Sequence, residues 1–333
     1  MESYDIFVEQ ALKNLKKGGV LSFVLPEAIL NVKTHTPIRQ FMLDNCSFQY
    51  IEFLGNAFDK VQCPCIILQM MLTEEKFCGI GLFVHDNHRK FSIQTARKLN
   101  AEYLSFSMTD EEYKIIEKLD NLNSSTTLLG KSRFALGIVT GNNKEYISKE
   151  KTDENEMILK GADLYKFKFI PSDHYIMFKP ESFQQAAPVE YYRAEEKLLY
   201  RFICSQLVFA YDNKQTLSLN SGNILIPEIE GLNIKYIMAV LNSRTAQFYF
   251  KRKFNSVKIL RSHIEHIPIP NAEPEVQNKI IDMVDSILET SERCIIKELY
   301  DRIDNEIANL YALDFHEYKI IKLVVEENNL FLF

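Results

Sequence analysis

Hydrophobic residues follow the periods of helices and strands along the first 73 residues. The stretch "ESYDIFVEQALKNLK" (residues 2–16) spaces apolar residues as an amphipathic helix does, with Ile6, Phe7, Ala11 and Leu15 near one face, and Gly18-Gly19 end it. Three apolar runs predict strands, "VLSFVLP", "FQYIEFLG" and "CPCIILQMM", with a helix "PIRQFMLDN" between the first two. This order is typical of the trailing half of an α/β sheet, whose last two strands, joined by "NAFDKVQ", run antiparallel.

The pattern loosens after Thr73 and changes twice more. A polar strand around "GIGLFVHD" precedes a helix in "TDEEYKIIEKLDNL", for which Thr109 is a good N-cap, and a boundary falls near Asn121 to Thr127. Short strands and turns then lead to one long helix, "IKYIMAVLNSRTAQFYFKRKF", which indicates an α+β domain. Beyond Pro274 the apolar spacing is helical. We therefore expect four segments, residues 1–73, 74–127, 128–270 and 271–333.

Composition indicates an ordinary globular protein. The 333 residues are 46% hydrophobic and carry a net charge of −6. The apolar run "CPCIILQMML" is far shorter than the ~20 residues needed to cross a bilayer, so we expect no membrane role. The cysteines lack the paired spacing of a metal site, and no secretory leader precedes them, which favours a reduced cytoplasm. They are Cys46, Cys63, Cys65, Cys78, Cys204 and Cys294.

One stretch departs from this acidic balance. Between Arg244 and His263 the sequence contains no Asp or Glu. Lys and Arg bind the phosphates of DNA by displacing condensed counterions, largely without regard to base sequence. We expect these basic groups to project outward and contact DNA, although a solvated helix face remains the alternative. The basic block consists of Arg244, Lys251, Arg252, Lys253, Lys258 and Arg261.

Several ordered strings resemble one enzyme family. "YDIFVEQALKNLKKGGVLSFVLPEAIL", "IEFLGNAFDKVQCPCIILQM", "LGKSRFALGIVTGNNKEYI", "LVFAYDNKQTLSLNSGNILIP" and "ILRSHIEHIPIP" are similar to successive landmarks of gamma-class adenine-N6 DNA methyltransferases of the TaqI type. The resemblance runs with gaps from about Tyr4 to Val325. It implies that residues 1–73 are the C-terminal half of a Rossmann-like methyltransferase sheet, residues 74–127 a connecting segment, residues 128–270 the target-recognition domain, and residues 271–333 a C-terminal helical segment.

The chain also departs from that family. The resemblance implies an S-adenosylmethionine loop and an Asn-Pro-Pro-Tyr motif, and neither is found in the 333 residues, which contain no Pro-Pro pair. Gly79-Ile80-Gly81 and "GIVTGNNK" do not complete a dinucleotide or phosphate-loop motif. We therefore expect S-adenosylmethionine to act in the complete enzyme but not to bind this chain, which has no catalytic residues of its own and is predicted to be inactive alone.

Two phenylalanines occupy positions where the family stacks the flipped target adenine. They are Phe7, in "YDIFVEQAL", and Phe58, in "GNAFDKV". A methyltransferase that acts on duplex DNA must extrude its target base and hold it between apolar faces. The structural alternatives are a core residue for Phe7 and a cap on the sheet edge for Phe58.

Base reading requires side chains that reach base edges, Asn or Gln for adenine and Arg or Lys for guanine. The turn "TGNNKEY" offers Asn142, Asn143 and Lys144, and "KGADLYKFK" offers Lys160 and Lys166. Turn formation alone also explains the first group.

Two further constellations are weaker. His263 and His266 flank an apolar Ile264 and lack metal-ligand neighbours, so we interpret them as polar surface or phosphate contacts. A metal-dependent nuclease would use an Asp followed by Glu-x-Lys, and Asp173, Glu195 and Lys197 fit that pattern only loosely.

The sequence thus predicts the DNA-recognition portion of a site-specific adenine-N6 methyltransferase of a restriction-modification system. The alternatives are a stand-alone specificity module that acts with a separate catalytic polypeptide, and a remnant without DNA affinity. Expected partners are double-stranded DNA, a polypeptide or segment carrying the missing motifs, and a restriction nuclease.

Overall fold

The computed structural model describes residues 2–58, 63–86, 89–254 and 256–325. The chain forms two compact units. Unit 1 comprises residues 1–116 with Arg252–Phe254, and unit 2 comprises residues 117–251 and 255–333. The helices of residues 271–333, which the sequence sets apart, therefore share a unit with residues 128–251 and 255–270.

Unit 1 contains a five-stranded sheet with the order β1-β3-β2-β4-β5. Strand β3 lies between β1 and β2 and is antiparallel to both, so the prediction that the second and third strands run antiparallel is confirmed. Strand β4 is parallel to β2 and antiparallel to β5. The strands are β1 (Val20–Pro26), β2 (Cys46–Gly55), β3 (Cys65–Leu72), β4 (Phe83–Asp86) and β5 (Arg89–Ser92).

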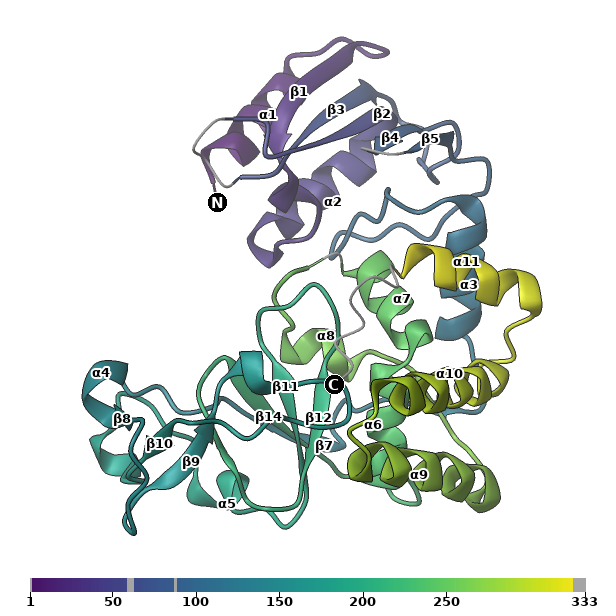
Figure 1. The fold of residues 1–333 in the computed structure, drawn as a ribbon. Helices are drawn as coiled ribbons and strands as arrows, with labels where there is room; N and C mark the ends of the chain where they lie inside the picture. Colours follow the sequence, from purple (N-terminus) through teal and green to yellow (C-terminus); the bar gives the residue numbers. More distant parts are fainter. Residues whose placement is uncertain (1, 59–62, 87–88, 255, 326–333) are drawn as a thin grey trace. The chain divides into compact units, whose positions relative to one another are not determined.

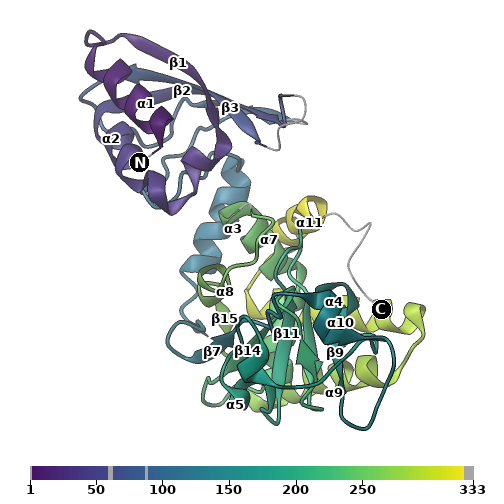
Figure 2. The same cartoon turned by 90° about the vertical axis from the view of Figure 1, so that its left-hand side faces the viewer.

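Helices α1 and α2 pack against each other and against this sheet (Figures 1 and 2). Val8 and Leu12 of α1 and Met42 of α2 bury their side chains in the core over Ile66 and Leu68 of β3. Two 3₁₀ turns precede α2. The helical elements are α1 (Ser3–Lys13), η1 (Glu27–Leu30), η2 (Lys33–His35) and α2 (Thr36–Asn45).

The buried face of α1 differs from the expected one. Asp5, Val8 and Leu12 face the core, whereas Ile6 and Phe7 are exposed. Asp5 can face the core because His35 hydrogen-bonds to its carboxylate and so compensates for the cost of burying it.

Helix α3 (Asp110–Asp120) begins as the sequence predicts. The amide of Glu112 donates to Thr109 Oγ1 at 3.2 Å, and the amide of Thr109 donates to Glu112 Oε2 at 2.9 Å. This reciprocal capping box fixes the start of the helix.

Unit 2 is an α+β arrangement built on two small sheets. One sheet has the order β12-β11-β14-β7 and is antiparallel, and the other has the order β13-β9-β10-β8. A short pair, β15 with β6, lies apart from them. The strands are β6 (Ser125–Thr126), β7 (Ser132–Ala135), β8 (Ile147–Ser148), β9 (Glu156–Leu159), β10 (Tyr175–Ile176), β11 (Lys197–Arg201), β12 (Phe209–Asp212), β13 (Leu217–Ser218), β14 (Gly222–Pro227) and β15 (Ile269–Pro270).

Helices α6, α9 and α10 pack together beside the β12 side of the first sheet (Figure 1). The helical spacing after Pro274 is confirmed by α9, α10 and α11. The helical elements of the region are α4 (Asn143–Tyr146), η3 (Gly161–Asp163), η4 (Pro180–Ser182), α5 (Val189–Tyr192), α6 (Ile234–Asn242), α7 (Arg244–Lys253), α8 (Arg261–Glu265), α9 (Pro274–Glu289), α10 (Arg293–Leu310) and α11 (Phe315–Val324).

The single long helix expected over "IKYIMAVLNSRTAQFYFKRKF" is wrong. It is divided into α6 and α7 at Ser243, which has an extended ψ of 158°. The Ser243 hydroxyl donates to the carbonyl of Val240 and accepts from the amide of Ala246, so it ends one helix and begins the next.

Candidate nucleic-acid interface

The basic block predicted between Arg244 and Arg261 is not one exposed face. Arg244 has only 2% of its side chain exposed. Its guanidinium donates to Asp304 at 3.0 Å and to Asp301 at 2.7 Å, and it lies over the ring of Tyr300. Burial alone would lower the pKa of Arg244, but the attraction of Asp304 outweighs it and the pKa is raised. The expectation that Arg244 projects outward is therefore wrong, because the side chain joins α7 to α10.

Arg252 is also engaged within the protein. It belongs to unit 1, where it donates to Glu112 at 2.8 Å and has 11% of its side chain exposed. Burial lowers its pKa, and Glu112 opposes that effect. Lys251 donates to the carbonyl of Val324 at 3.0 Å, and Lys253 is half-buried. Lys251 and Arg252 thus hold the end of α7 in place, and their expected outward orientation is not found.

Lys258 and Arg261 are the exposed members of the block. Arg261 begins α8, donates to Glu265 at 2.9 Å and lies over the ring of Phe134. Of the nearby histidines, His266 is exposed, whereas burial lowers the pKa of His263 to about 4. The exposed positive charge of this region is thus concentrated after residue 255.

The turn that offers amide groups is exposed as expected. Asn142, Asn143 and Lys144 lie at the start of the short helix α4. Gly141 has a φ of 80°, which allows the sharp turn. Thr140 donates to the side-chain oxygen of Asn143 at 2.6 Å and so fixes its orientation. The exposed side-chain amide of Asn142 donates to Glu145 Oε2 at 3.3 Å, and the side chain of Lys144 is exposed.

The two lysines of "KGADLYKFK" differ in environment. Lys160 is partly exposed, and its ammonium donates to His174 Nε2 at 2.8 Å. Lys166 is fully buried and donates to the carbonyl of Asn242 at 2.8 Å and to Tyr300 Oη at 3.2 Å. Burial lowers the pKa of Lys166 to about 7. Lys166 is therefore an internal structural group, and the expectation that it contacts DNA is wrong.

Phe7 and Phe58 are both exposed aromatic side chains of unit 1. Phe7 has 68% of its surface exposed and Phe58 has 56%. The reading of Phe7 as a core residue is therefore wrong. Phe58 follows the carboxyl end of β2, where ligands of α/β sheets usually bind.

A buried polar chain holds the first turn of α1, and sequence reasoning missed it. His35 Nδ1 lies 2.9 Å from Asp5 Oδ2, and His35 Nε2 lies 2.7 Å from Tyr4 Oη. Burial raises the pKa of Tyr4 to about 12, and the neighbouring carboxylates of Asp5 and Glu2 add to the shift. No sequence signal links His35 to Asp5, because 30 residues separate them.

The nuclease constellation is not assembled. Lys197 is fully buried and pairs with Asp212 at 2.6 Å, while Asp173 is exposed and pairs with Lys149 and His174. The described residues contain no group of three or more His, Cys, Asp or Glu side chains placed to hold a metal ion. Within the same described ranges, no helix is both long and apolar enough to span a bilayer.

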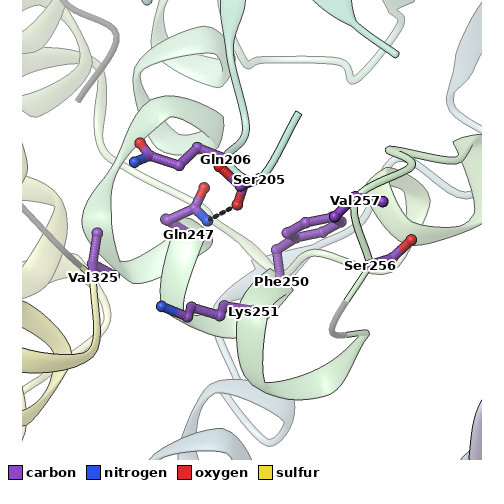
Figure 3. Close-up of a pocket in the computed structure, with 8 residues that line it drawn as sticks. All are labelled: Ser205, Gln206, Gln247, Phe250, Lys251, Ser256, Val257 and Val325. Carbon is purple, nitrogen blue, oxygen red and sulfur yellow. Dashed lines mark hydrogen bonds between the residues drawn. The ribbon is translucent and has the colours of Figure 1, made fainter. Parts of the chain in front are cut away.

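A cavity of about 180 Å³ lies in unit 2 beside the exposed basic region (Figure 3). Figure 3 shows Gln247, Phe250 and Lys251 of α7 on one side and Ser256 and Val257 on another. Ser205, Gln206 and Val325 complete the lining, and Gln247 donates to the carbonyl of Ser205 at 3.3 Å. The side chains of its Ser, Gln and Lys residues can form hydrogen bonds.

Two family descriptions match the chain. Residues 156–269 match the TaqI-like C-terminal specificity domain, and residues 1–58 match the Eco57I restriction-modification methylase family. These matches confirm the resemblance found in the sequence. The class they define is the specificity part of restriction-modification methyltransferases, and residues 156–269 carry its specificity domain.

Particular relatives agree with that class. The chain is 27% identical over 161 residues to the type II methyltransferase M.VspI of Vibrio sp. (strain 343), a match that covers 48% of this chain and 39% of the relative. It is 26% identical over 169 residues to the type II restriction enzyme and methyltransferase RM.Eco57I of Escherichia coli, covering 47% of this chain and 17% of the relative. The matches thus span well under half the length of these relatives.

The fold is also similar to that of a solved enzyme. The type IIL restriction-modification enzyme MmeI, determined in complex with DNA, superposes with a TM-score of 0.59 at 9% identity. The superposition covers 96% of this chain and 52% of MmeI. At this identity the likeness concerns the fold alone.

Proposed function

We propose that this chain is the DNA-recognition portion of a site-specific adenine-N6 DNA methyltransferase of a restriction-modification system. The observation that carries the proposal is the specificity domain matched at residues 156–269. The M.VspI match supports the methyltransferase assignment. The chemistry of the complete protein, its cofactor and its target atom belong to the proposal.

The DNA-contacting residues that we propose are the exposed members of the predicted set. Lys144, Lys258 and Arg261 supply cationic groups for phosphates. Asn142 and Asn143 supply amides at an exposed turn, the chemistry that pairs with adenine edges in the major groove. Lys160, Lys251 and Lys253 are half-buried and lie at the margin of this set.

The flipped target base is proposed to stack on Phe58, with Phe7 as a second apolar face. An aromatic ring that stays exposed in a folded protein is available for stacking, and stacking on a base contributes ~1–3 kcal/mol. Phe58 follows a strand end, and the Tyr4, Asp5 and His35 chain holds the helix that bears Phe7. These features support a target-base site near the carboxyl end of β2 in unit 1.

S-adenosylmethionine is proposed as the methyl donor of the complete enzyme. The described residues of unit 1 do not fit it by themselves, because Gly18 and Gly19 lie between a helix and the strand that follows, not between a strand and a helix. The chain alone is proposed to be inactive.

A second candidate is a stand-alone specificity module that works with a separate catalytic polypeptide. Both candidates place the missing Asn-Pro-Pro-Tyr motif outside the 333 residues. A gene segment encoding that motif in frame with this chain favours the first, and a motif on a separate polypeptide favours the second.

The proposal is tested by titrating the chain with a 30-base-pair duplex pool of random sequence, followed by fluorescence anisotropy. We expect binding that weakens as salt rises, with a slope of about −0.9 in log K against log salt for each phosphate contact. Calorimetric titration with S-adenosylmethionine is the companion experiment, and we expect no heat of binding. Salt-independent affinity, or no binding of duplex DNA, would contradict the proposal.

A further inference from the structure

Two segments of unit 2 that are far apart in sequence form a short antiparallel ladder. The amide of Cys204 donates to the carbonyl of Val257 at 2.9 Å, and the amide of Ile259 donates to the carbonyl of Phe202 at 2.8 Å. Ile203 and Lys258 are paired between these two bonds. We name residues 202–204 with 257–259 the 203–258 ladder.

Two apolar side chains of the ladder are exposed. Ile203 has 66% of its surface exposed and Val257 has 63%. Their neighbours Cys204 and Ile259 are buried and anchor the ladder. Ile203 and Lys258 are directly opposite each other in an antiparallel pair, so their side chains share one face. That face therefore combines an exposed β-branched side chain with an exposed ammonium.

The charged residues of the two sequence segments that form the ladder are all basic. Residues 201–207 and 251–261 contain no Asp or Glu, while both contain Lys or Arg. Val257 precedes Lys258 in the strand and therefore faces the opposite side of the ladder, where it lines the cavity of Figure 3. Polyanionic DNA is complementary to segments of this charge, whereas an apolar protein partner does not require the cations.

We propose that the 203–258 ladder enters the major groove of duplex DNA, with Ile203 against a thymine methyl group and Lys258 on a phosphate. A two-stranded ribbon fits the width of that groove, and apolar side chains contact the thymine C5-methyl group there. The inference rests on the proposed DNA-recognition function. It assigns sequence discrimination to an apolar residue in addition to Asn142 and Asn143.

The test uses a duplex of the sequence that the wild-type chain enriches from a randomised pool, made with thymidine or with deoxyuridine. Deoxyuridine removes only the methyl group. We expect wild type to bind the deoxyuridine duplex about fourfold more weakly for each contacted methyl, the affinity equivalent of one buried methylene. The variant Ile203→Ala should bind both duplexes equally.

Matched controls separate this effect from general damage. Ile295→Ala changes the same exposed residue type in the same unit and should retain the full sensitivity to deoxyuridine. Lys258→Ala should flatten the salt slope by about 0.9, and the exposed Lys297→Ala should leave it unchanged. Circular dichroism and melting temperature check the fold of each variant.

The outcomes distinguish the ladder from the wider function. If wild type enriches a sequence but ignores the loss of thymine methyls, or if Ile203→Ala remains as sensitive as wild type, the ladder proposal is wrong and the DNA-recognition function stands. If Ile203→Ala instead abolishes self-association measured by sedimentation, the surface is a protein contact and the proposal is likewise overturned. If wild type binds no duplex, both fail.

Discussion

Replacing Arg244 distinguishes an internal ion pair from a phosphate contact. Asp304 is fully buried and Arg244 nearly so, and their closest side-chain atoms are 3.0 Å apart. Arg244→Ala leaves the Asp304 carboxylate buried without its cation, which destabilises by ~3–5 kcal/mol. For a unit of about this size, each kcal/mol lowers the melting temperature by ~2–4 °C, so we expect a fall of about 6–20 °C in the transition of unit 2.

Urea unfolding followed by circular dichroism measures this loss, and two variants calibrate it. Arg244→Lys keeps the charge but loses the forked contact with Asp301 and Asp304, so we expect an intermediate loss. Arg133→Ala removes an exposed pair with Glu228 in the same unit and should change stability by at most ~1 kcal/mol. If Arg244→Ala is as stable as Arg133→Ala but flattens the salt slope of DNA binding by ~1, Arg244 faces DNA and our reasoning is refuted.

Three further predictions follow from burial and exposure. The pKa of Lys166 is about 7 in the folded chain against an ordinary 10.5. Between about pH 7 and 10 the unfolded chain therefore binds more protons, and the free energy of unfolding rises with pH. Lys166→Met should flatten this rise in urea titrations, and an unchanged slope would show that Lys166 is not the group responsible. Phe58→Ala removes an exposed ring, so the free energy of unfolding should change by less than ~0.5 kcal/mol. In the complete enzyme, the fluorescence of 2-aminopurine placed at the target base should lose the signal of stacking. A large loss of stability would point to a structural role for Phe58. Asn142→Ala/Asn143→Ala should reduce discrimination between the enriched sequence and random DNA by ~1–3 kcal/mol for each lost base contact. The slope of log K against log salt should not change. Equal weakening of binding to all sequences would identify a contact with the DNA backbone instead.

Local rules in the sequence predicted the elements that depend on neighbouring residues. The Thr109 cap, the antiparallel pairing of β2 with β3 and the C-terminal helices follow from spacing and capping within a few residues. The break at Ser243 was not predicted, because a hydroxyl that serves two helices resembles any serine within a helical pattern.

Burial of charge was beyond the reach of the sequence. Arg244 and Lys166 appear as surface cations until the fold places Asp304 and Tyr300 of α10 against them, 60 and 134 residues away. Likewise, the buried face of α1 depends on His35 satisfying Asp5. Only two of the six residues of the basic block, Lys258 and Arg261, are exposed as expected, and the carboxylate that Arg261 contacts is the local Glu265.

The central claim is that this chain recognises duplex DNA at a particular sequence. Repeated selection of bound duplexes from a randomised 30-base-pair pool, followed by sequencing, tests it most directly. The account predicts that one short motif is enriched and that its affinity falls with increasing salt. A bound pool that remains random in sequence, or a chain that retains no duplex at low salt, would contradict it.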